Sequence, residues 1–214
     1  MKAASIGLLL LLSIFLTGSI IISGRPSCNY LVSRKLKENI SPQIKFQLSR
    51  KVPTLLAIFA HPDDELLTGA TLAHYASEGK KVYVAIATDG ALGTTDFSNI
   101  PVGRQLAETR HAEMICSAKA LGVEPVFIGL PDQLGASRGA LPQQLDSLRR
   151  AIVSLMFSLH PDVVITFGAE GWTGHPDHRL VGIIVTEVFA SRQWSEIPQL
   201  YYPALPTGSI NDSS

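Results

Sequence analysis

The sequence has little cysteine and no surplus of charge of either sign. Its 214 residues include only two cysteines, Cys28 and Cys116, which are too few and too far apart for a disulfide framework or a cysteine-based zinc site. The 18 Lys and Arg balance the 18 Asp and Glu, and a net charge of zero argues against a nucleic-acid partner. The 46% hydrophobic and 17% charged content excludes a mostly disordered chain. A globular domain remains, in which any metal must be bound by histidine and carboxylate side chains.

Residues 3–24 are uncharged and mostly apolar, and such a run crosses a bilayer if it is helical at about 1.5 Å per residue. We therefore expect residues 1–24 to be a signal peptide or a membrane anchor. The anchor is slightly favoured over export after signal cleavage, because the cations downstream outnumber Lys2 and would hold the following domain on the cytoplasmic side: Arg25, Arg34, Lys35 and Lys37. Residues 25–51 are polar and irregular, and we interpret them as a linker or lead-in.

From Val52 onward, short apolar runs alternate with segments of helical spacing. The runs predict strands at Thr54–Ala60, Lys81–Thr88, Pro125–Gly129, Asp162–Phe167 and Gln199–Tyr202. The spacing between them predicts helices at Leu66–Glu78, Gln105–Leu121, Leu141–Leu159 and Leu180–Ser191. This alternation predicts an α/β fold, namely a Rossmann-like, mostly parallel sheet with helices on both faces, preceded by an N-terminal hydrophobic helix.

Acidic and imidazole side chains follow the predicted strands at the point where each strand ends. In an open parallel sheet, ligands bind beyond the carboxyl ends of the strands. The first four runs lead into residues that suit such a site: His61, Asp63, Asp64 and Glu65, then Asp89, then Asp132, and finally Glu170, Trp172, His175, Asp177 and His178. We therefore expect one site at this edge of the sheet.

The negative charges of Asp63, Asp64 and Glu65 repel one another unless a cation or a helix N-terminus offsets them. One interpretation is that Asp63 or Asp64 only caps the helix that follows. The second cluster favours a metal, because an imidazole from residues 175–178 can join His61 and one acid as two histidines and a carboxylate, which leaves coordination positions open, as in catalytic zinc sites. Fe²⁺ is the alternative metal, since some oxygenases use the same ligand types. A dinucleotide site is disfavoured, because carboxylates occupy the turn where such a site needs glycines.

We assign His61, Asp64 and His178 to the metal and leave Asp63 free to act as the general base. Adjacent side chains leave a turn in different directions, so one of the two acids can coordinate while the other faces the bound water. In this first assignment Asp64 is the ligand.

The remaining candidates have supporting roles. Asp177 would orient an imidazole through its free N–H, and His175 would donate a hydrogen bond to a developing oxyanion. We expect substrate contacts from four further residues: Asp89, Arg104, Arg110 and Trp172. Each also has a plainer alternative, in which Asp89 only forms a turn, the two arginines only lie on a solvated helix face, and Trp172 only packs.

Three motifs resemble the PIG-L/LmbE-like family of zinc-dependent N-acetylglucosaminyl deacetylases: AHPDDE at 60–65, TDG at 88–90 and HPDH at 175–178. The resemblance covers about residues 53–202. It implies the same zinc ligands, the same general base at Asp63 and an oxyanion-stabilising role for His175. It also implies a deacetylase domain over 52–214, short at its C-terminus, because the family usually continues with another strand and helix.

The activity that this resemblance implies is that of a zinc-dependent de-N-acetylase, a hydrolase acting on linear amide C–N bonds. The substrate would be a small-molecule or lipid-linked N-acetylglucosaminide, and the N-terminal segment, if uncleaved, would bring the domain to a membrane. The alternative is an anchored, non-catalytic amino-sugar-binding module with a vestigial metal site. The aglycone and the oligomeric state do not follow from the sequence.

Overall fold

The computed structural model describes residues 52–93, 99–135, 139–191, 194 and 198–204. The predicted N-terminal hydrophobic helix, within 1–24, and the lead-in 25–51 lie outside the described residues. None of the helices in these described ranges has the length and apolar character that crossing a bilayer requires.

Among the described residues, five strands form a single sheet in the order β3-β2-β1-β4-β5. Their bounds are β1 Thr54–Phe59, β2 Lys81–Thr88, β3 Glu124–Leu130, β4 Val163–Ile165 and β5 Gln199–Tyr201. Every neighbouring pair is parallel, and Leu55 of β1 pairs with Val82 on one side and Val163 on the other. The predicted parallel α/β sheet is confirmed, and its strands lie close to the predicted positions.

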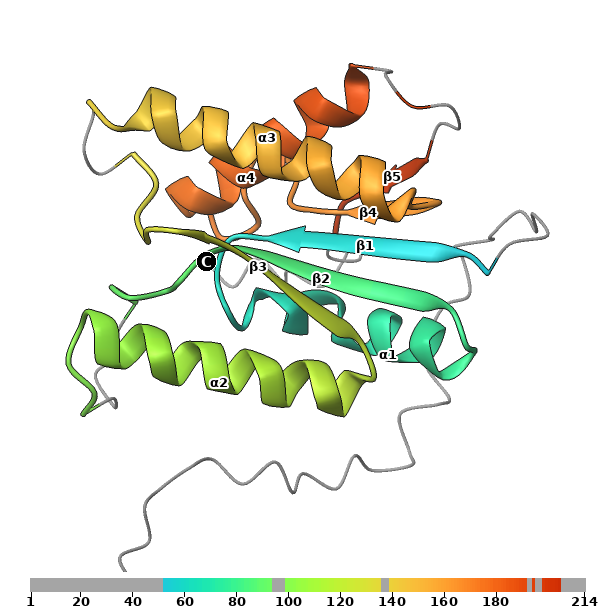
Figure 1. Cartoon of the computed structure of the whole chain (residues 1–214), viewed down its shortest axis with the longest axis horizontal. Helices are drawn as coiled ribbons and strands as arrows, with labels where there is room; N and C mark the ends of the chain where they lie inside the picture. Colours follow the sequence, from blue (N-terminus) through green and yellow to red (C-terminus); the bar gives the residue numbers. More distant parts are fainter. Residues whose placement is uncertain (1–51, 94–98, 136–138, 192–193, 195–197, 205–214) are drawn as a thin grey trace, which may run out of the picture.

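Helices cover both faces of the sheet, as Figure 1 shows, with α1 and α2 on one face and α3 and α4 on the other. Their bounds are α1 Gly69–Ser77, α2 Arg104–Leu121, α3 Leu141–Leu159 and α4 Pro176–Ala190, and a short 3₁₀ helix, η2, spans Asp64–Thr68. All six residues of the central strand β1 are buried. A strand covered on both faces has no polar side, which is why its sequence is uniformly apolar.

The strand order reverses between β1 and β4. From β1 the chain continues outward to β2 and β3, and α3 then brings it back across the sheet to β4 and β5. The loops that leave the carboxyl ends of β1 and β4 therefore diverge, and such a switch point is where ligands bind in open α/β sheets. Residues after β1 and after β4 meet there although they are far apart in sequence.

Two helix boundaries differ from the prediction. The predicted helix Leu66–Glu78 is two elements, η2 and α1, and α4 begins at Pro176 instead of Leu180. The first turn of α4 is polar and shows no apolar period, but Pro176 suits the first helical position, and the ring of His175 accepts a hydrogen bond from the backbone N–H of Asp177. Asp177 and His178 consequently lie on a helix and not on a loop.

The helix α4 packs directly on the backbone that follows β4. A Cβ atom at Gly182 would lie 2.5 Å from the carbonyl oxygen of Phe167 and 3.1 Å from that of Gly168. Gly182 lies about one helical turn beyond His178, so this close approach also places His178 against the end of β4.

The variant Gly182→Ala should lower the free energy of unfolding by about 1–3 kcal/mol, because α4 must move away from the sheet. The control is Gly69→Ala in α1, where a Cβ would meet Leu121 at an ordinary 3.6 Å. Gly69→Ala should leave the stability unchanged or raise it by about 0.4–1 kcal/mol. Urea unfolding of both variants provides the measurement, and equal stabilities would contradict the close packing of α4.

Candidate metal centre

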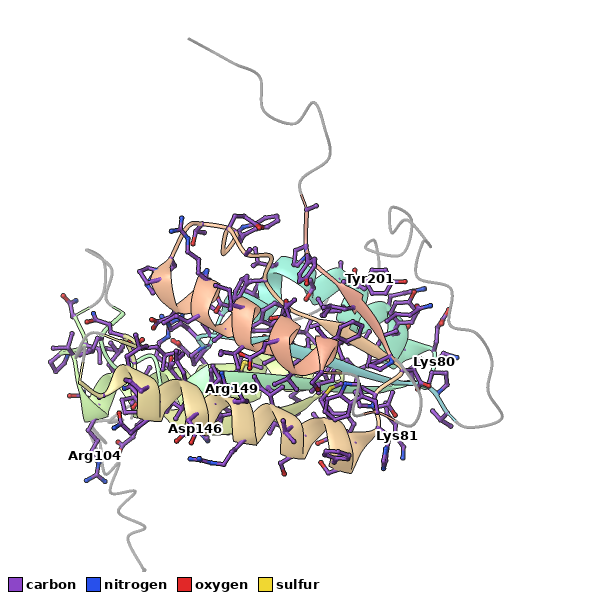
Figure 2. The ribbon with its side chains drawn as sticks, turned by 90° about the horizontal axis from the view of Figure 1, so that it is seen from above. Lys80, Lys81, Arg104, Asp146, Arg149 and Tyr201 are labelled. Atoms are coloured by element: carbon purple, nitrogen blue, oxygen red, sulfur yellow. The ribbon has the colours of Figure 1, made fainter. Side chains whose placement is uncertain are left out.

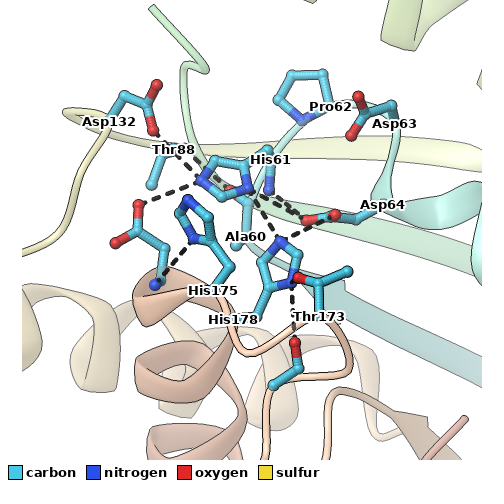
Figure 3. Close-up of polar contacts among 12 residues, drawn as sticks. Ala60, His61, Pro62, Asp63, Asp64, Thr88, Asp132, Thr173, His175 and His178 are labelled. Atoms are coloured by element: carbon cyan, nitrogen blue, oxygen red, sulfur yellow. Dashed lines mark hydrogen bonds and ion pairs between the residues drawn. The ribbon is translucent and has the colours of Figure 1, made fainter. Parts of the chain in front are cut away.

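Three side chains meet at the switch point, as Figure 3 shows: His61 after β1, Asp64 at the start of η2 and His178 in the first turn of α4. Nδ1 of His61 lies 3.3 Å from Nε2 of His178. Asp64 lies 3.2 Å from that His178 nitrogen through Oδ1 and 3.5 Å from Nδ1 of His61 through Oδ2. The structure thus brings together the three residues that the sequence assigns to a metal. We call them the ligand set.

These separations suit a single tetrahedral cation. Ligand atoms at about 2.0–2.2 Å from a zinc ion lie about 3.3–3.6 Å from one another. The two imidazole nitrogens are 3.3 Å apart, and the carboxylate of Asp64 reaches His178 at 3.2 Å with one oxygen and His61 at 3.5 Å with the other. A nitrogen of His175 lies within 4.8 Å of nitrogens of His61 and His178, and atoms of Asp132 and Asp177 lie equally close to His61. Two imidazoles and a carboxylate are suitable ligands for Zn²⁺ and for Fe²⁺.

The ring of His178 is oriented so that Nε2 faces the ligand set. Its Nδ1 lies 3.1 Å from the carbonyl oxygen of Gly171 and 3.2 Å from the hydroxyl of Thr173. The ring also stacks on buried Phe167, with centroids 4.2 Å apart and planes only 6° apart. A proton on Nδ1 satisfies the Gly171 carbonyl and leaves the lone pair of Nε2 free for a metal.

His61 is oriented in the same manner by two carboxylates. Its Nε2 lies 3.2 Å from Asp177 and 3.3 Å from Asp132, so its Nδ1 faces the other two ligands. The sequence predicted that Asp177 orients an imidazole, and the structure places it on His61. The corresponding contact of Asp132 was not predicted, although the position of Asp132 after the third strand is the signal that could have revealed it.

Neighbouring charges shift the pKa values of His61 and Asp64 in opposite directions. Burial lowers the pKa of His61, but hydrogen bonds to Asp132, Asp177 and Asp64 outweigh this effect and raise it to about 11. Burial raises the pKa of Asp64, but hydrogen bonds from His178 and His61 hold it well below its usual range. A proton on His61 therefore balances the surrounding carboxylates when no metal is bound, and a divalent cation can replace that positive charge.

Asp63 and Asp64 point to different sides of their turn. Asp63 has a left-handed backbone, with φ 100° and ψ −23°, which costs of the order of 1–3 kcal/mol in a residue other than glycine. The side chain of Asp64 is 8% exposed and that of Asp63 is 61% exposed. Asp63 occupies the N-cap position of η2 but makes no side-chain capping hydrogen bond. The simple helix-cap interpretation is therefore not what the structure shows.

Arg110 of α2 is the ion-pair partner of Asp63. Its Nη2 lies 2.7 Å from Oδ2 of Asp63 and also donates to the carbonyl oxygen of Pro62. Arg110 is mostly buried, with 18% of its side chain exposed. The sequence predicts that Arg110 contacts the substrate; in the structure its guanidinium pairs with Asp63.

The other predicted residues lie at different distances from the ligand set. Arg104 is 91% exposed and pairs with Glu108 on the same helix, at the outer surface of the molecule (Figure 2), so no contact among the described residues joins it to the site. Trp172 is half-buried and packs against the core. Arg104 thus lies on a solvated helix face and Trp172 is a packing residue, which are the plainer alternatives for both.

His175 and Asp89 lie beside the ligand set. His175 is exposed, and its ring is perpendicular to that of His61, with centroids 4.9 Å apart. Oδ1 of Asp89 accepts hydrogen bonds from the backbone N–H groups of Ala91 and Asp132, as a turn residue would. Asp89 also lines a cavity of about 310 Å³ together with Pro62, Thr88, Ala107, Glu108, His111, Phe127 and Gly129.

The fold and the site define a Rossmann-like α/β protein with a candidate mononuclear metal centre at its switch point. Comparison with known families is more specific. The family described as PIG-L, GlcNAc-PI de-N-acetylase, matches residues 56–189, and the chain belongs to this family.

Curated relatives and solved structures agree with this assignment. The chain is 32% identical to the 1D-myo-inositol 2-acetamido-2-deoxy-alpha-D-glucopyranoside deacetylase of Mycobacterium sp. strain KMS; the match covers 78% of this chain and 59% of that protein. The structure of N,N'-diacetylchitobiose deacetylase from Pyrococcus horikoshii is similar at 30% identity and a TM-score of 0.50, over 69% of this chain and 53% of that one.

A further solved structure shares only the fold. It is the 4-carboxy-2-hydroxymuconate hydratase of Pseudomonas putida KT2440, with 18% identity and a TM-score of 0.54, covering 71% of this chain and 63% of that one. One architecture therefore occurs in proteins with different activities, and the reaction has to be argued from the site.

We expect the purified protein to bind one divalent cation per chain and His178→Ala to weaken that binding by at least about 100-fold, because loss of a partner behind a ligand already costs about 10–100-fold. The control is His74→Ala, since His74 lies on α1 and pairs only with Glu78, directly after that helix, in the described ion pairs. Isothermal titration of the metal-free protein with Zn²⁺ provides the measurement. Equal affinities in the two variants would rule out this ligand set.

Proposed function

We propose that this chain is a metal-dependent de-N-acetylase that hydrolyses the acetamide of an N-acetylglucosaminyl compound. The observation that carries the proposal is the ligand set at 3.2–3.5 Å with one acid, Asp63, adjacent to it and outside it. Membership of the PIG-L family and the deacetylases among its relatives support the same reaction. The chain spans about 59% of the first of these relatives, so the activity of the whole protein is part of the proposal.

The proposed division of roles begins with the cation, which His61, Asp64 and His178 would hold. A bound Zn²⁺ polarises a carbonyl group and lowers the pKa of water toward about 7. Asp177 and Asp132 would keep Nδ1 of His61 directed at the cation, and Gly171 would do the same for Nε2 of His178.

Asp63 is the proposed general base. It would take the proton of the attacking water and return it to the amine that leaves, so the products are acetate and a free amino sugar. Burial raises the pKa of the Asp63 carboxyl, and the ion pair with Arg110 opposes this effect and holds the side chain in one orientation. A base that is not itself a metal ligand retains the lone pair that proton transfer requires.

His175 is the proposed donor to the oxyanion that forms when the amide carbonyl is attacked. Burial and the neighbouring His61 lower the pKa of His175, which favours the neutral imidazole. Its Nδ1 accepts a hydrogen bond from the backbone N–H of Asp177, so the proton of the neutral ring lies on Nε2. That N–H is then available to a substrate at the exposed mouth of the site.

We infer the substrate class from the sugar that the relatives' substrates have in common. The names of the mycobacterial and Pyrococcus relatives describe an inositol glycoside and a disaccharide, and both contain N-acetylglucosamine. We propose the same sugar here, in small-molecule or lipid-linked form, with a sugar contact from Asp89, which lines the cavity beside the ligand set. Residues 1–24 would act as membrane anchor or signal peptide for this domain.

Acetate release from N-acetylglucosaminyl compounds tests the proposal, with the inositol glycoside, diacetylchitobiose and a glycolipid as candidates. Asp63→Asn should lower kcat by about 10²–10⁴-fold while the metal stays bound, because a general base contributes about that factor. The matched control is Asp146→Asn on the exposed surface of α3. Chelation should abolish turnover, and addition of Zn²⁺ should restore it.

Two outcomes would contradict the proposal. A metal-loaded protein that binds the sugar and releases no acetate would be the non-catalytic binding module. Turnover that requires molecular oxygen would point to an Fe²⁺ oxygenase in place of a hydrolase.

A further inference from the structure

We propose that Glu65 and Ser117 are positioning residues that hold Asp63 in the orientation its proposed role as general base requires. This inference rests on the proposed function. It concerns the last acid of the AHPDDE motif, which takes no part in the ligand set, and a serine on α2 that the sequence did not single out.

Glu65 is buried and both oxygens of its carboxylate are engaged. Only 1% of the residue is exposed. Oε2 accepts a hydrogen bond of 2.9 Å from the backbone N–H of Asp63, and Oε1 accepts one of 2.5 Å from the hydroxyl of Ser117. A buried carboxylate must have such partners, and hydrogen bonds to an ionised acceptor are among the strongest in proteins.

Glu65 binds the backbone of Asp63, whose conformation is strained. Asp63 is left-handed at φ 100°, a conformation that persists only where its surroundings enforce it. Its N–H precedes η2 and therefore has no partner within that helix. The carboxylate of Glu65 is the acceptor that satisfies this N–H, and it thereby stabilises the turn that separates Asp63 from Asp64.

The helix α2 holds Asp63 at two points. Arg110 binds the carboxylate of Asp63, and Ser117 holds its backbone through Glu65. Positions 110 and 117 are seven residues apart, which is about two helical turns, so both side chains leave the same face of α2. The direction of the base is thus defined relative to α2, and the ligand set is defined by β1 and α4.

Glu65 acts through Asp63 and not as an acid or base itself. Its two oxygens face Asp63 and Ser117, and no described hydrogen bond or ion pair joins its side chain to the ligand set. A glutamine can reproduce both contacts, accepting from the Asp63 N–H and donating to the Ser117 hydroxyl. A leucine can make neither contact.

These differences define the variants and the expected results. Glu65→Leu should lower kcat by about 10–100-fold, a part of the factor that a general base supplies, with KM and the bound metal nearly unchanged. Glu65→Gln should retain kcat within about threefold, and Ser117→Ala should lower it by about three- to tenfold. Ser158→Ala is the matched control, because Ser158 is an exposed helical serine of α3 whose hydroxyl bonds only locally to Leu155.

A double-mutant cycle with Asp63→Asn separates positioning from general loss of structure. Substitutions that act through the same carboxylate do not have additive effects on kcat. Glu65→Leu and Ser117→Ala should therefore lose their effect on kcat in the Asp63→Asn background. If they lower kcat by the same factor in both backgrounds, the inference is wrong and the proposed function stands. If Asp63→Asn itself retains full kcat, the proposed function loses its base.

Hydrogen exchange at the backbone N–H of Asp63 provides a test that needs no turnover. The bond to buried Glu65 should protect this amide, and Glu65→Leu should accelerate its exchange by at least about tenfold while Glu65→Gln leaves it protected. Ser117→Ala serves the same purpose if Glu65→Leu does not fold. Unchanged exchange in folded Glu65→Leu, or in Ser117→Ala where Glu65→Leu does not fold, would overturn the inference even in a chain that releases no acetate.

Discussion

The adjacent pairing of β1 with β4 is the constraint on which the site depends. It brings Nδ1 of His61 within 3.3 Å of Nε2 of His178, although the two residues are 117 positions apart. Two buried hydroxyls strengthen the end of β1: Thr88 donates to the carbonyl oxygen of Ala60, and Thr166 of the β4 side donates to that of Ile58. The polar backbone at the strand end is thereby satisfied without water, so His61 leaves the sheet from a defined point.

Charge explains why such a cluster is found at this point of the fold. Several carboxylates and imidazoles lie within one hydrogen-bond length of one another and are largely buried, a state that is stable only if a positive charge lies among them. The raised pKa of His61 shows that a proton can supply that charge. A divalent cation supplies more charge at the same place, and the outer contacts of both imidazoles already leave the inner nitrogens free for it.

The sequence predicted most of the fold and the ligand set because both follow from local patterns. Uniformly apolar runs mark strands covered on both faces, and the carboxyl ends of parallel strands share an edge, so residues 61–64 and 175–178 could be placed together in advance. The sequence could not show that α4 begins at Pro176, since its first turn is polar. Nor could it identify Asp132 as a partner of His61, because several acids follow the strands and only the three-dimensional arrangement selects among them.

The separation of Asp63 from Asp64 is the step that local pattern could suggest but not explain. Adjacent side chains leave a turn in different directions, but this alone does not show which of the two acids faces inward. Here the left-handed Asp63 turns its side chain toward Arg110, while Asp64 points inward and also accepts a hydrogen bond from the backbone N–H of His61. That conformation is unfavourable on its own, so other contacts must stabilise it. Glu65 accepts the backbone N–H of Asp63, and α2 supplies Arg110 to the Asp63 carboxylate and Ser117 to Glu65. The helix therefore contributes to the proposed chemistry although no described hydrogen bond or ion pair joins it to the ligand set: its contacts turn Asp63 away from Asp64, as the proposed roles of general base and metal ligand require.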